Sequence, residues 1–177
     1  MADGIVGNKF EHYPKEIKQG IHLHRAIDTF TDSHDIVKQS KRRLHERYKH
    51  YKGVIIDIFY DHFLAKNWTT YSDVPLAIYV DEFYDLLEAH FDILPLGTKR
   101  MMPYMIADNW LLSYQSIEGI TRVLEGMNRR TKNKSQMNLA VNELQEFYNE
   151  FETEFTAFFD ELTTFSKHKL IELNNDL

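Results

Sequence analysis

Two short stretches of the chain carry residue types that could bind a metal ion. The first, G-I-H-L-H-R-A-I-D at 20–28, holds two histidines, an arginine and an aspartate. On a helical wheel, His24 and Asp28 share a face at the edge of an apolar sector and could converge on one ion. His22 and Arg25 fall towards the other side. We therefore expect His22 to be exposed, or to contact a metal ligand without binding the ion itself. Taken alone, this stretch favours an ordinary surface His–Asp pair.

The second stretch, V-I-I-D-I-F-Y-D-H-F-L at 54–64, is apolar apart from Asp57, Asp61 and His62. A helix that is apolar nearly all round should be buried. Buried carboxylates are costly unless they are paired or bind a metal, and Asp57 and Asp61 would repel each other on one helix face. A divalent cation, or a partner such as Arg25, would offset that repulsion. Alternatively, one or both acids lie at a solvent-exposed edge or form salt bridges with the neighbouring basic helix.

The absence of cysteine narrows the chemistry. It excludes disulfides, thiolate metal sites and a cysteine nucleophile, and it fits a reducing cytoplasm, where we expect the protein to act. Histidine and carboxylate ligands indicate a hard or borderline ion such as Mn²⁺, Fe²⁺, Mg²⁺ or Zn²⁺. The motifs G-x-S-x-G, G-x-G-x-x-G and H-E-x-x-H and a Walker loop are absent, as are a long apolar run and a signal peptide, so we expect no membrane span.

Charge is unevenly distributed along the chain, whose net charge is −6. Lysine and arginine dominate 38–52 and 122–134, whereas acids dominate from 143 to the end. The basic segments could hold an acidic partner, although ordinary solvated helix surface is the alternative. The net negative charge argues against nucleic acid. The candidate partner-binding residues are Lys41, Arg42, Arg43, Arg129 and Arg130.

The elements that must position these residues are all predicted to be helices. Glycine (7) and proline (4) are scarce among 177 residues, which favours long helices in one all-α domain, a helical bundle. Helices are expected over 14–31, 33–49, 54–64, 75–91, 98–108, 111–127 and 139–165. Ser33 and Ser135 are the expected N-caps of the second and last helices. The last helix carries a stripe expected to face the core, formed by Leu139, Leu144, Phe147, Tyr148, Phe151, Phe155, Phe158, Phe159, Leu162 and Phe165.

These motifs closely resemble those of the acyl carrier protein phosphodiesterases. G-I-H-L-H-R-A-I-D-T-F-T-D and D-I-F-Y-D-H-F-L-A-K-N-W carry most of the resemblance, and D-N-W-L-L-S-Y and V-L-E-G-M-N-R-R extend it. The resemblance implies an all-α fold like that of the HD metal-dependent phosphohydrolases. It also implies release of 4′-phosphopantetheine from holo acyl carrier protein, with Mn²⁺ as the usual metal.

The resemblance also implies a set of site residues. The metal ligands would be drawn from Asp3, His24, Asp28, Asp57, Asp61 and His62. Arg25 would hold a phosphate oxygen, while His22, His62 or a second water would protonate the leaving serine oxygen. Family members normally begin further upstream, with a segment like N-F-L-A-H, so we expect the site of this chain to lack one histidine.

Two other functions remain open from the sequence. The chain could be a non-catalytic helical module that binds an acidic carrier protein through its basic helices. It could also be an HD-type enzyme that acts on another phosphoester. Asn109-Trp110 and Arg129-Arg130 match positions of the resembled family, but the sequence assigns them no role in the chemistry.

Overall fold

The computed structural model describes residues 7, 10 and 12–176, and this part of the chain contains helices and loops but no strand. The predicted all-α fold is therefore confirmed. The α-helices are α1 (Lys15–Ser33), α2 (Asp35–Arg43), α3 (Lys52–Lys66), α4 (Leu76–Ala89), α5 (Leu96–Ala107), α6 (Trp110–Ser113), α7 (Ile117–Arg130), α8 (Ala140–Glu146) and α9 (Tyr148–Asp176). Four 3-10 helices, Glu46–Tyr51, Trp68–Thr70, Phe91–Ile93 and Met137–Leu139, lie between them. None of the described helices combines the length and apolarity that crossing a membrane requires.

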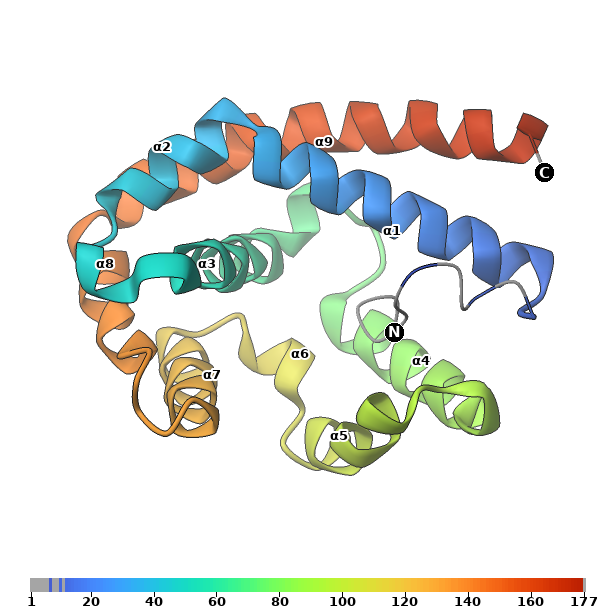
Figure 1. Ribbon diagram of the computed structural model, residues 1–177, viewed down its shortest axis with the longest axis horizontal. Helices are drawn as coiled ribbons and strands as arrows, with labels where there is room; N and C mark the ends of the chain where they lie inside the picture. The colour runs from blue at the N-terminus through green and yellow to red at the C-terminus, as the bar shows by residue number, and fades with distance from the viewer. Residues whose placement is uncertain (1–6, 8–9, 11, 177) are drawn as a thin grey trace.

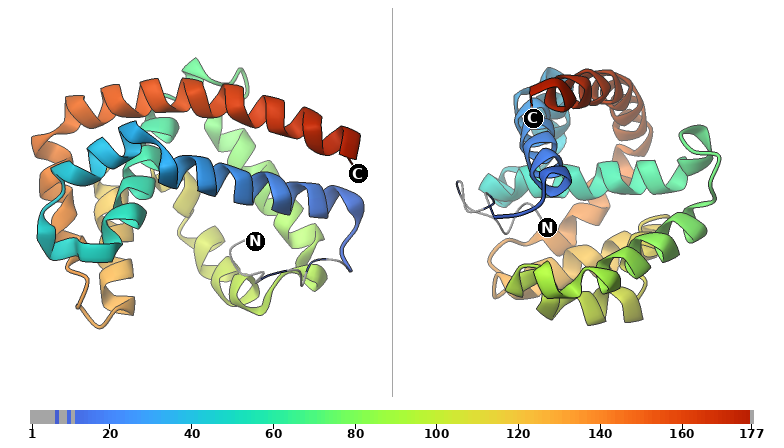
Figure 2. Two further views of the ribbon diagram at one scale, coloured as in Figure 1. Left: turned by 45° about the horizontal axis from the view of Figure 1, so that its top comes forward. Right: turned by 90° about the vertical axis from the view of Figure 1, so that its right-hand side faces the viewer.

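The long helices α1 and α9 lie side by side in opposite directions along one side of the molecule (Figure 1). Helix α3 runs across them, and α4 to α7 form the opposite side (Figures 1 and 2). Near one end of the pair, the Gln19 side chain donates a hydrogen bond to the Leu173 carbonyl (3.2 Å). Further along, Phe30 stacks on Phe165, with ring centroids 4.4 Å apart. The α1–α9 pair thus joins the start and the end of the chain.

Helix α3 forms the centre of the main hydrophobic core. It packs against α2, α7 and α9, and its isoleucine and aromatic side chains are buried. This confirms the prediction from its apolar composition, because only a helix covered on several sides can bury residues all round. The buried residues of α3 are Ile55, Ile56, Ile58, Phe59, Tyr60, His62, Phe63 and Ala65.

A second apolar cluster joins α4, α5 and α6 and lies beyond the carboxyl end of α3. Leu76, Val80 and Tyr84 line one face of α4 at helical spacing, and they pack with Met102 and Met105 of α5. Pro75 precedes the first residue of α4, as the sequence predicts. This cluster therefore packs α6 against α4 and α5, and α6 in turn contacts α7.

Two predicted N-caps are wrong. Ser33 ends α1, and its hydroxyl donates to the Thr29 carbonyl (2.8 Å). His34 caps α2 instead, because its Nδ1 accepts a hydrogen bond from the Ile36 amide (3.3 Å). Ser135 is fully buried, and its hydroxyl hydrogen-bonds the Asn128 side chain (3.0 Å) rather than starting the last helix.

Three predicted helices are interrupted in the structure. The basic helix ends at Arg43, and the 3-10 helix that follows contains Lys49 in a non-helical conformation with a φ of 49°. The helix expected over 111–127 is divided into α6 and α7. The last helix is broken at Phe147, whose φ and ψ of −112° and 33° separate α8 from α9. Periodicity alone does not reveal such breaks, because apolar side chains are packed on both sides of each of them.

The aromatic stripe of α9 faces the core as predicted. Phe151, Phe155 and Phe158 are buried, and Phe155 packs edge-on against Tyr60 of α3 with ring centroids 5.6 Å apart. Aromatic pairs of this kind stabilise a core beyond the area that they bury. The stripe is a packing surface and binds α9 to α3.

A buried carboxylate also joins α9 to α2. Glu154 accepts hydrogen bonds from the Gln39 side chain (2.8 Å), from the Ser40 hydroxyl (2.5 Å) and from Arg43 Nε and Nη2 (3.0 and 2.7 Å). The Tyr60 hydroxyl completes the network through Ser40 (2.8 Å). The buried Glu154 carboxylate therefore has hydrogen-bond donors for both of its oxygens. If the carboxylate were removed, Arg43 would lose the negative charge that it pairs with.

We predict that Glu154→Gln lowers the free energy of unfolding by about 3 kcal/mol, because it leaves the Arg43 guanidinium beside a neutral amide in a half-buried position. Glu150→Gln is the matched control: it makes the same change one turn earlier at an exposed position of α9. Its effect should stay within about 0.5 kcal/mol. Urea denaturation measures both, and equal effects of the two substitutions would contradict the structural role of Glu154.

Candidate active site

Asp57 and Asp61 form the polar edge of α3. Both are exposed, although the residues around them in the sequence are largely buried. Since they lie four residues apart on a helix, the two carboxylates share one face. The sequence alternative that both acids lie at a solvent-exposed edge is therefore confirmed, and they are not buried in the core. This edge is the only part of α3 that offers carboxylates to a ligand.

The Asp61 carboxyl group has an unusual pKa. Solvent reaches it, but protein surrounds it on most sides, and this desolvation together with the nearby charge of Asp57 raises its pKa to about 7. In the described part of the chain, no cationic side chain forms an ion pair with Asp61. A carboxyl group that titrates near neutral pH can bind a cation or exchange a proton.

On α1, His24 and Asp28 are paired with each other. Nδ1 of His24 lies 2.8 Å from Oδ2 of Asp28, and the side chains are 35% and 54% exposed. The two residues share a face, as their spacing predicts. Because Asp28 holds Nδ1, it favours the imidazole tautomer whose Nε2 accepts a proton or a metal ion.

His22 and Arg25 pack against the start of the chain rather than pointing into solvent. The His22 ring meets the Phe10 ring edge-on, with centroids 5.0 Å apart. The Arg25 guanidinium lies over the same ring, 4.8 Å from its centroid, and donates a hydrogen bond to the Gly7 carbonyl (2.7 Å). His22 is half-buried, so it is not exposed, because the helical wheel contains no information about a segment that packs onto α1. The alternative that His22 contacts a metal ligand without binding the ion itself stays a prediction.

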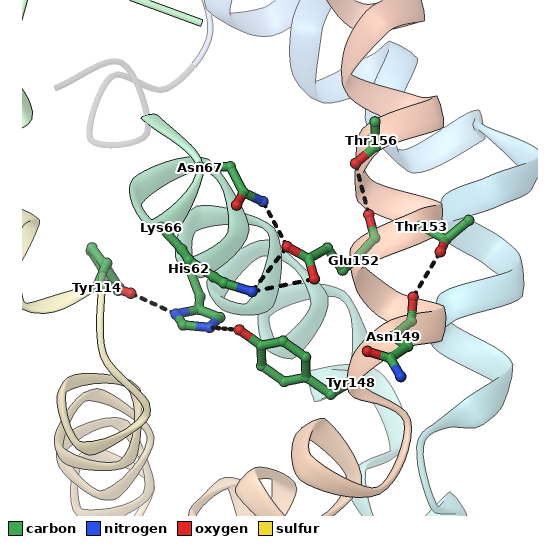
Figure 3. Close-up of polar contacts among 9 residues, drawn as sticks. All are labelled: His62, Lys66, Asn67, Tyr114, Tyr148, Asn149, Glu152, Thr153 and Thr156. Carbon is green, nitrogen blue, oxygen red and sulfur yellow. Dashed lines mark hydrogen bonds and ion pairs between the residues drawn. The ribbon is translucent and has the colours of Figure 1, made fainter. Parts of the chain in front are cut away.

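His62 lies in the core, and both of its ring nitrogens have partners (Figure 3). Nδ1 donates to the Tyr114 carbonyl (2.7 Å), so Nε2 accepts from the Tyr148 hydroxyl (2.8 Å). Burial lowers the pKa of His62, which keeps the ring neutral. His62 therefore connects α3 to α9 and to the loop before α7, and the structure does not bring its nitrogens to the two carboxylates of α3.

A second polar group in Figure 3 continues from His62 along α3. Glu152 of α9 accepts hydrogen bonds from Lys66 Nζ (3.0 Å) and from the Asn67 side chain (2.8 Å). Burial of Glu152 opposes ionisation, but these donors together hold its pKa below the ordinary value. The Lys66 ammonium also lies 4.7 Å from the centre of the Tyr148 ring. These contacts fix the end of α3 against α9.

The predicted metal ligands come together only as pairs. Among the described residues, no three histidine, aspartate or glutamate side chains are grouped closely enough to hold a metal ion. The pairs are His24–Asp28 on α1 and Asp57–Asp61 on α3. Asp3, also predicted as a ligand, lies outside the described residues. The donor chemistry suits a hard cation, while the described ligands are fewer than a closed site needs.

The candidate partner-binding cations differ in how they are used. Lys41 pairs with Asp32 (3.0 Å) and Arg43 with Glu154 (2.7 Å), so both contribute to intramolecular ion pairs. Arg42 is exposed. Arg129 lies 3.8 Å from Glu125, whereas the Arg130 guanidinium lies over the Trp110 ring, 5.8 Å from its centroid.

The sequence and a protein-family model agree on the relatives of this chain. The model described as acyl carrier protein phosphodiesterase matches residues 1–162. The chain belongs to the acyl carrier protein phosphodiesterase family. This confirms the resemblance carried by the two stretches on α1 and α3. It does not test which residues bind a metal, so the ligand assignments stay predictions.

Curated acyl carrier protein phosphodiesterases align with nearly the whole chain. The enzyme of Klebsiella pneumoniae is 32% identical over 174 residues, which are 96% of this chain and 88% of the relative. That of Photorhabdus laumondii is 29% identical over 163 residues, 90% of this chain and 81% of the relative. That of Escherichia coli is 29% identical over 175 residues, 97% of this chain and 89% of the relative. No solved structure matches the chain significantly.

The sequence analysis assigned no role to three residues that have distinctive contacts or conformations in the structure. Tyr148 is part of the aromatic stripe, but its hydroxyl binds His62; a buried tyrosine needs such a partner, which was the available signal. Tyr114 supplies the carbonyl for His62, and no sequence signal marks it. Asn109 has a left-handed φ of 43°, and its buried Oδ1 accepts no hydrogen bond within the described structure.

We predict that His62→Ala lowers the free energy of unfolding by about 3 kcal/mol, because it leaves a cavity and removes the partner of the Tyr148 hydroxyl. His24→Ala removes a histidine from the solvent-accessible His24–Asp28 pair of α1. It should lower the free energy of unfolding by less than about 1 kcal/mol. Urea denaturation near neutral pH compares them. If the two substitutions cost the same, His62 is not the structural histidine that the contacts indicate.

We also predict that ionised Glu152 stabilises the fold and that acid removes this contribution to the free energy of unfolding. Because its pKa is lowered in the folded state, ionised Glu152 stabilises the fold above its ordinary pKa, and this contribution disappears as pH falls through the lower folded value. Urea unfolding of the parent protein between roughly pH 6 and pH 3 should therefore weaken more steeply than that of Glu152→Gln. Glu146→Gln, at an exposed position, should follow the parent curve.

Proposed function

We propose that this member of the family is a metal-dependent phosphodiester hydrolase that releases 4′-phosphopantetheine from holo acyl carrier protein. The observation that carries the proposal is the Asp57–Asp61 pair, in which surrounding protein and the second carboxylate raise the pKa of Asp61 to about 7. A cation at this edge would relieve the repulsion between the two carboxylates. The names of the curated relatives supply acyl carrier protein as the substrate, and the family resemblance supplies its 4′-phosphopantetheine arm as the group released.

The ion is proposed to bind the Asp57–Asp61 pair, while His24–Asp28 is a separate candidate pair, since among the described residues the two pairs are not grouped around one ion. Oxygen and imidazole ligands suit Mn²⁺, Mg²⁺, Fe²⁺ and Zn²⁺, and the family resemblance makes Mn²⁺ the first candidate. A bound divalent ion would polarise the phosphate and lower the pKa of a water molecule at the site. The proposal needs further ligands beyond each pair, and Asp3 is the remaining predicted residue that could supply one.

The residues of the chain have separate tasks in this proposal. The hydrogen bond from His24 to Asp28 orients the imidazole and favours one tautomer. The leaving serine oxygen requires a proton. Of the two histidines predicted as general acids, His22 is half-buried, while both nitrogens of His62 are held in the core. The proposal therefore assigns the general acid to His22, or to a second water, and not to His62.

An acidic carrier protein would meet the cations that are not committed to buried ion pairs. Arg42, Arg129 and Arg130 are exposed, whereas Arg43 is held by the buried Glu154. Electrostatic attraction of this kind raises the association rate and weakens with salt. We therefore assign carrier attraction to the three exposed arginines and a structural role to Arg43.

The decisive experiment incubates purified holo acyl carrier protein with the metal-free chain and added Mn²⁺, and follows loss of the prosthetic arm by mass spectrometry. We expect conversion to the apo form, and Asp61→Asn should reduce its rate at least about a hundredfold. This substitution should preserve the fold, because the raised pKa of Asp61 means that the folded state already disfavours its charge.

Asp85→Asn, at an exposed position of α4, is the matched control and should retain the parent rate. Metal binding is read separately by calorimetric titration of Mn²⁺ into the parent and Asp61→Asn proteins, with weaker binding expected for the variant. Parent protein that leaves holo carrier intact with every candidate metal, or an Asp61→Asn protein that is fully active, would contradict the proposal.

A further inference from the structure

Arg130 has surroundings that distinguish it from the other exposed cations. It is the last residue of α7, and its guanidinium lies 5.8 Å from the centre of the Trp110 ring. Arginine stacks on aromatic faces in this way while its N–H groups remain directed outward along the guanidinium plane. In the described part of the chain, no carboxylate forms an ion pair with Arg130. Its neighbour Arg129 instead lies near Glu125.

Tyr114 links Arg130 to the carboxylates of α3. Burial, together with the charge of Asp61, raises the pKa of Tyr114 to about 12, and the charge of Arg130 opposes this rise. One side chain is thus within electrostatic reach of both groups. The backbone of Tyr114 is held at the same place by the hydrogen bond between its carbonyl and His62, the residue next to Asp61 (2.7 Å). Asp61 of α3 and Arg130 of α7 are therefore both neighbours of Tyr114.

A buried set of hydrogen bonds fixes the helix end that carries Arg130. The Asn128 side chain accepts from the Ser135 hydroxyl (3.0 Å) and donates to Asn133 (3.1 Å), and the Thr131 hydroxyl donates to the Asn128 carbonyl (2.8 Å). Thr131 and Ser135 also bond to each other (2.9 Å). These bonds bracket Arg130 in the sequence. A functional side chain on such a rigid support loses less entropy when it binds a ligand.

The backbone directly before Trp110 is strained. Asn109, directly before it, adopts a left-handed conformation with φ 43° and ψ 58°, and its Oδ1 is buried without a hydrogen bond in the described structure. Both features cost free energy at a non-glycine residue. Gly119 of α7 lets α6 approach closely, because a Cβ there would lie 1.8 Å from the Ser113 carbonyl oxygen. Trp110 and Arg130 are thus brought together by specific local structure.

We propose that Arg130, positioned by Trp110, binds the phosphate group of the substrate next to the Asp57–Asp61 edge. A guanidinium fork matches two phosphate oxygens, and a cation here complements the negative charge that the carboxylates would otherwise repel. Arg25 is less suited to this role, since its guanidinium donates to the Gly7 carbonyl. The inference rests on the proposed function for the identity of the phosphate ester, and on the Arg130–Trp110 contact for the site itself.

Trp110 provides a direct readout that does not depend on catalysis. Trp68 and Trp110 are the two tryptophans of the chain, so Trp68→Phe leaves Trp110 as the single indole reporter. Inorganic phosphate and 4′-phosphopantetheine are titrated into this metal-free protein. Movement of Arg130 relative to the indole should change the Trp110 emission. Arg130→Gln on the same background should weaken binding of both probes at least about tenfold, since it removes a charge-assisted pair of hydrogen bonds.

Arg122→Gln is the matched control, with the same change at another exposed arginine of α7 that has no role in the proposal, and its binding should stay within about twofold of the background protein. Circular dichroism and thermal unfolding verify that both variants fold. Equal binding by the Arg130→Gln and background proteins would overturn the inference, as would equal weakening by the two substitutions.

The same proteins are assayed with holo carrier protein and Mn²⁺, which separates this inference from the proposed function. Phosphate binding that depends on Arg130, with no hydrolysis by the parent, supports the inference and rejects the proposed function. Hydrolysis by the parent, with unchanged probe binding and unchanged turnover in Arg130→Gln, rejects the inference and leaves the proposed function intact.

Discussion

The burial of α3 on every side except one determines how the rest of this structure is arranged. An apolar helix must be covered, and α2, α7 and α9 cover it with aromatic and aliphatic side chains. The exposed residues of α3 are Asp57, Asp61 and, at its end, Lys66. The two carboxylates therefore share one face of the central helix. Desolvation by the surrounding protein and the charge of Asp57 raise the pKa of Asp61.

Buried polar contacts, as well as apolar packing, attach the covering helices to α3 and α2. His62 bonds the Tyr148 hydroxyl of α9 and the Tyr114 carbonyl before α7. Glu154 of α9 gathers donors from α2, including both nitrogens of the Arg43 fork. Such groups stabilise one arrangement of helices, because any other would leave them buried without partners. His62 and Arg43, which the sequence marks as candidate site residues, therefore stabilise the packing of the helices in this protein.

Two local features of this structure cost free energy. The Asp57 and Asp61 carboxylates share one helix face, and Asn109, directly before Trp110, holds a strained conformation with a buried oxygen that accepts no hydrogen bond in the described structure. Costs of this kind are common where a protein binds its ligand, and the Arg130 guanidinium lies over Trp110. A divalent cation and a phosphate group would together relieve the charge repulsion, which connects the proposed hydrolysis with the proposed role of Arg130.

Much of this protein could be predicted from its sequence. Scarce glycine and proline and regular apolar spacing predict an all-α fold, and the composition of 54–64 predicts the buried helix. The spacing of His24–Asp28 and Asp57–Asp61 predicts that each pair shares a face. The motifs also identify the family, which the family model matches over residues 1–162. These conclusions depend on local periodicity and on residue type, which the sequence contains in full.

Tertiary structure alone decided which residues belong to the framework and which to the candidate site. His62 and Asp61 are adjacent in the sequence, yet successive residues of a helix point about 100° apart, so one enters the core and the other faces solvent. The partners of His62, Tyr114 and Tyr148, lie 52 and 86 residues away. Arg43 and Arg130 are the same residue type, but Arg43 pairs with a buried carboxylate and Arg130 lies over a half-buried indole. Such differences arise from contacts between distant segments, which no local pattern records.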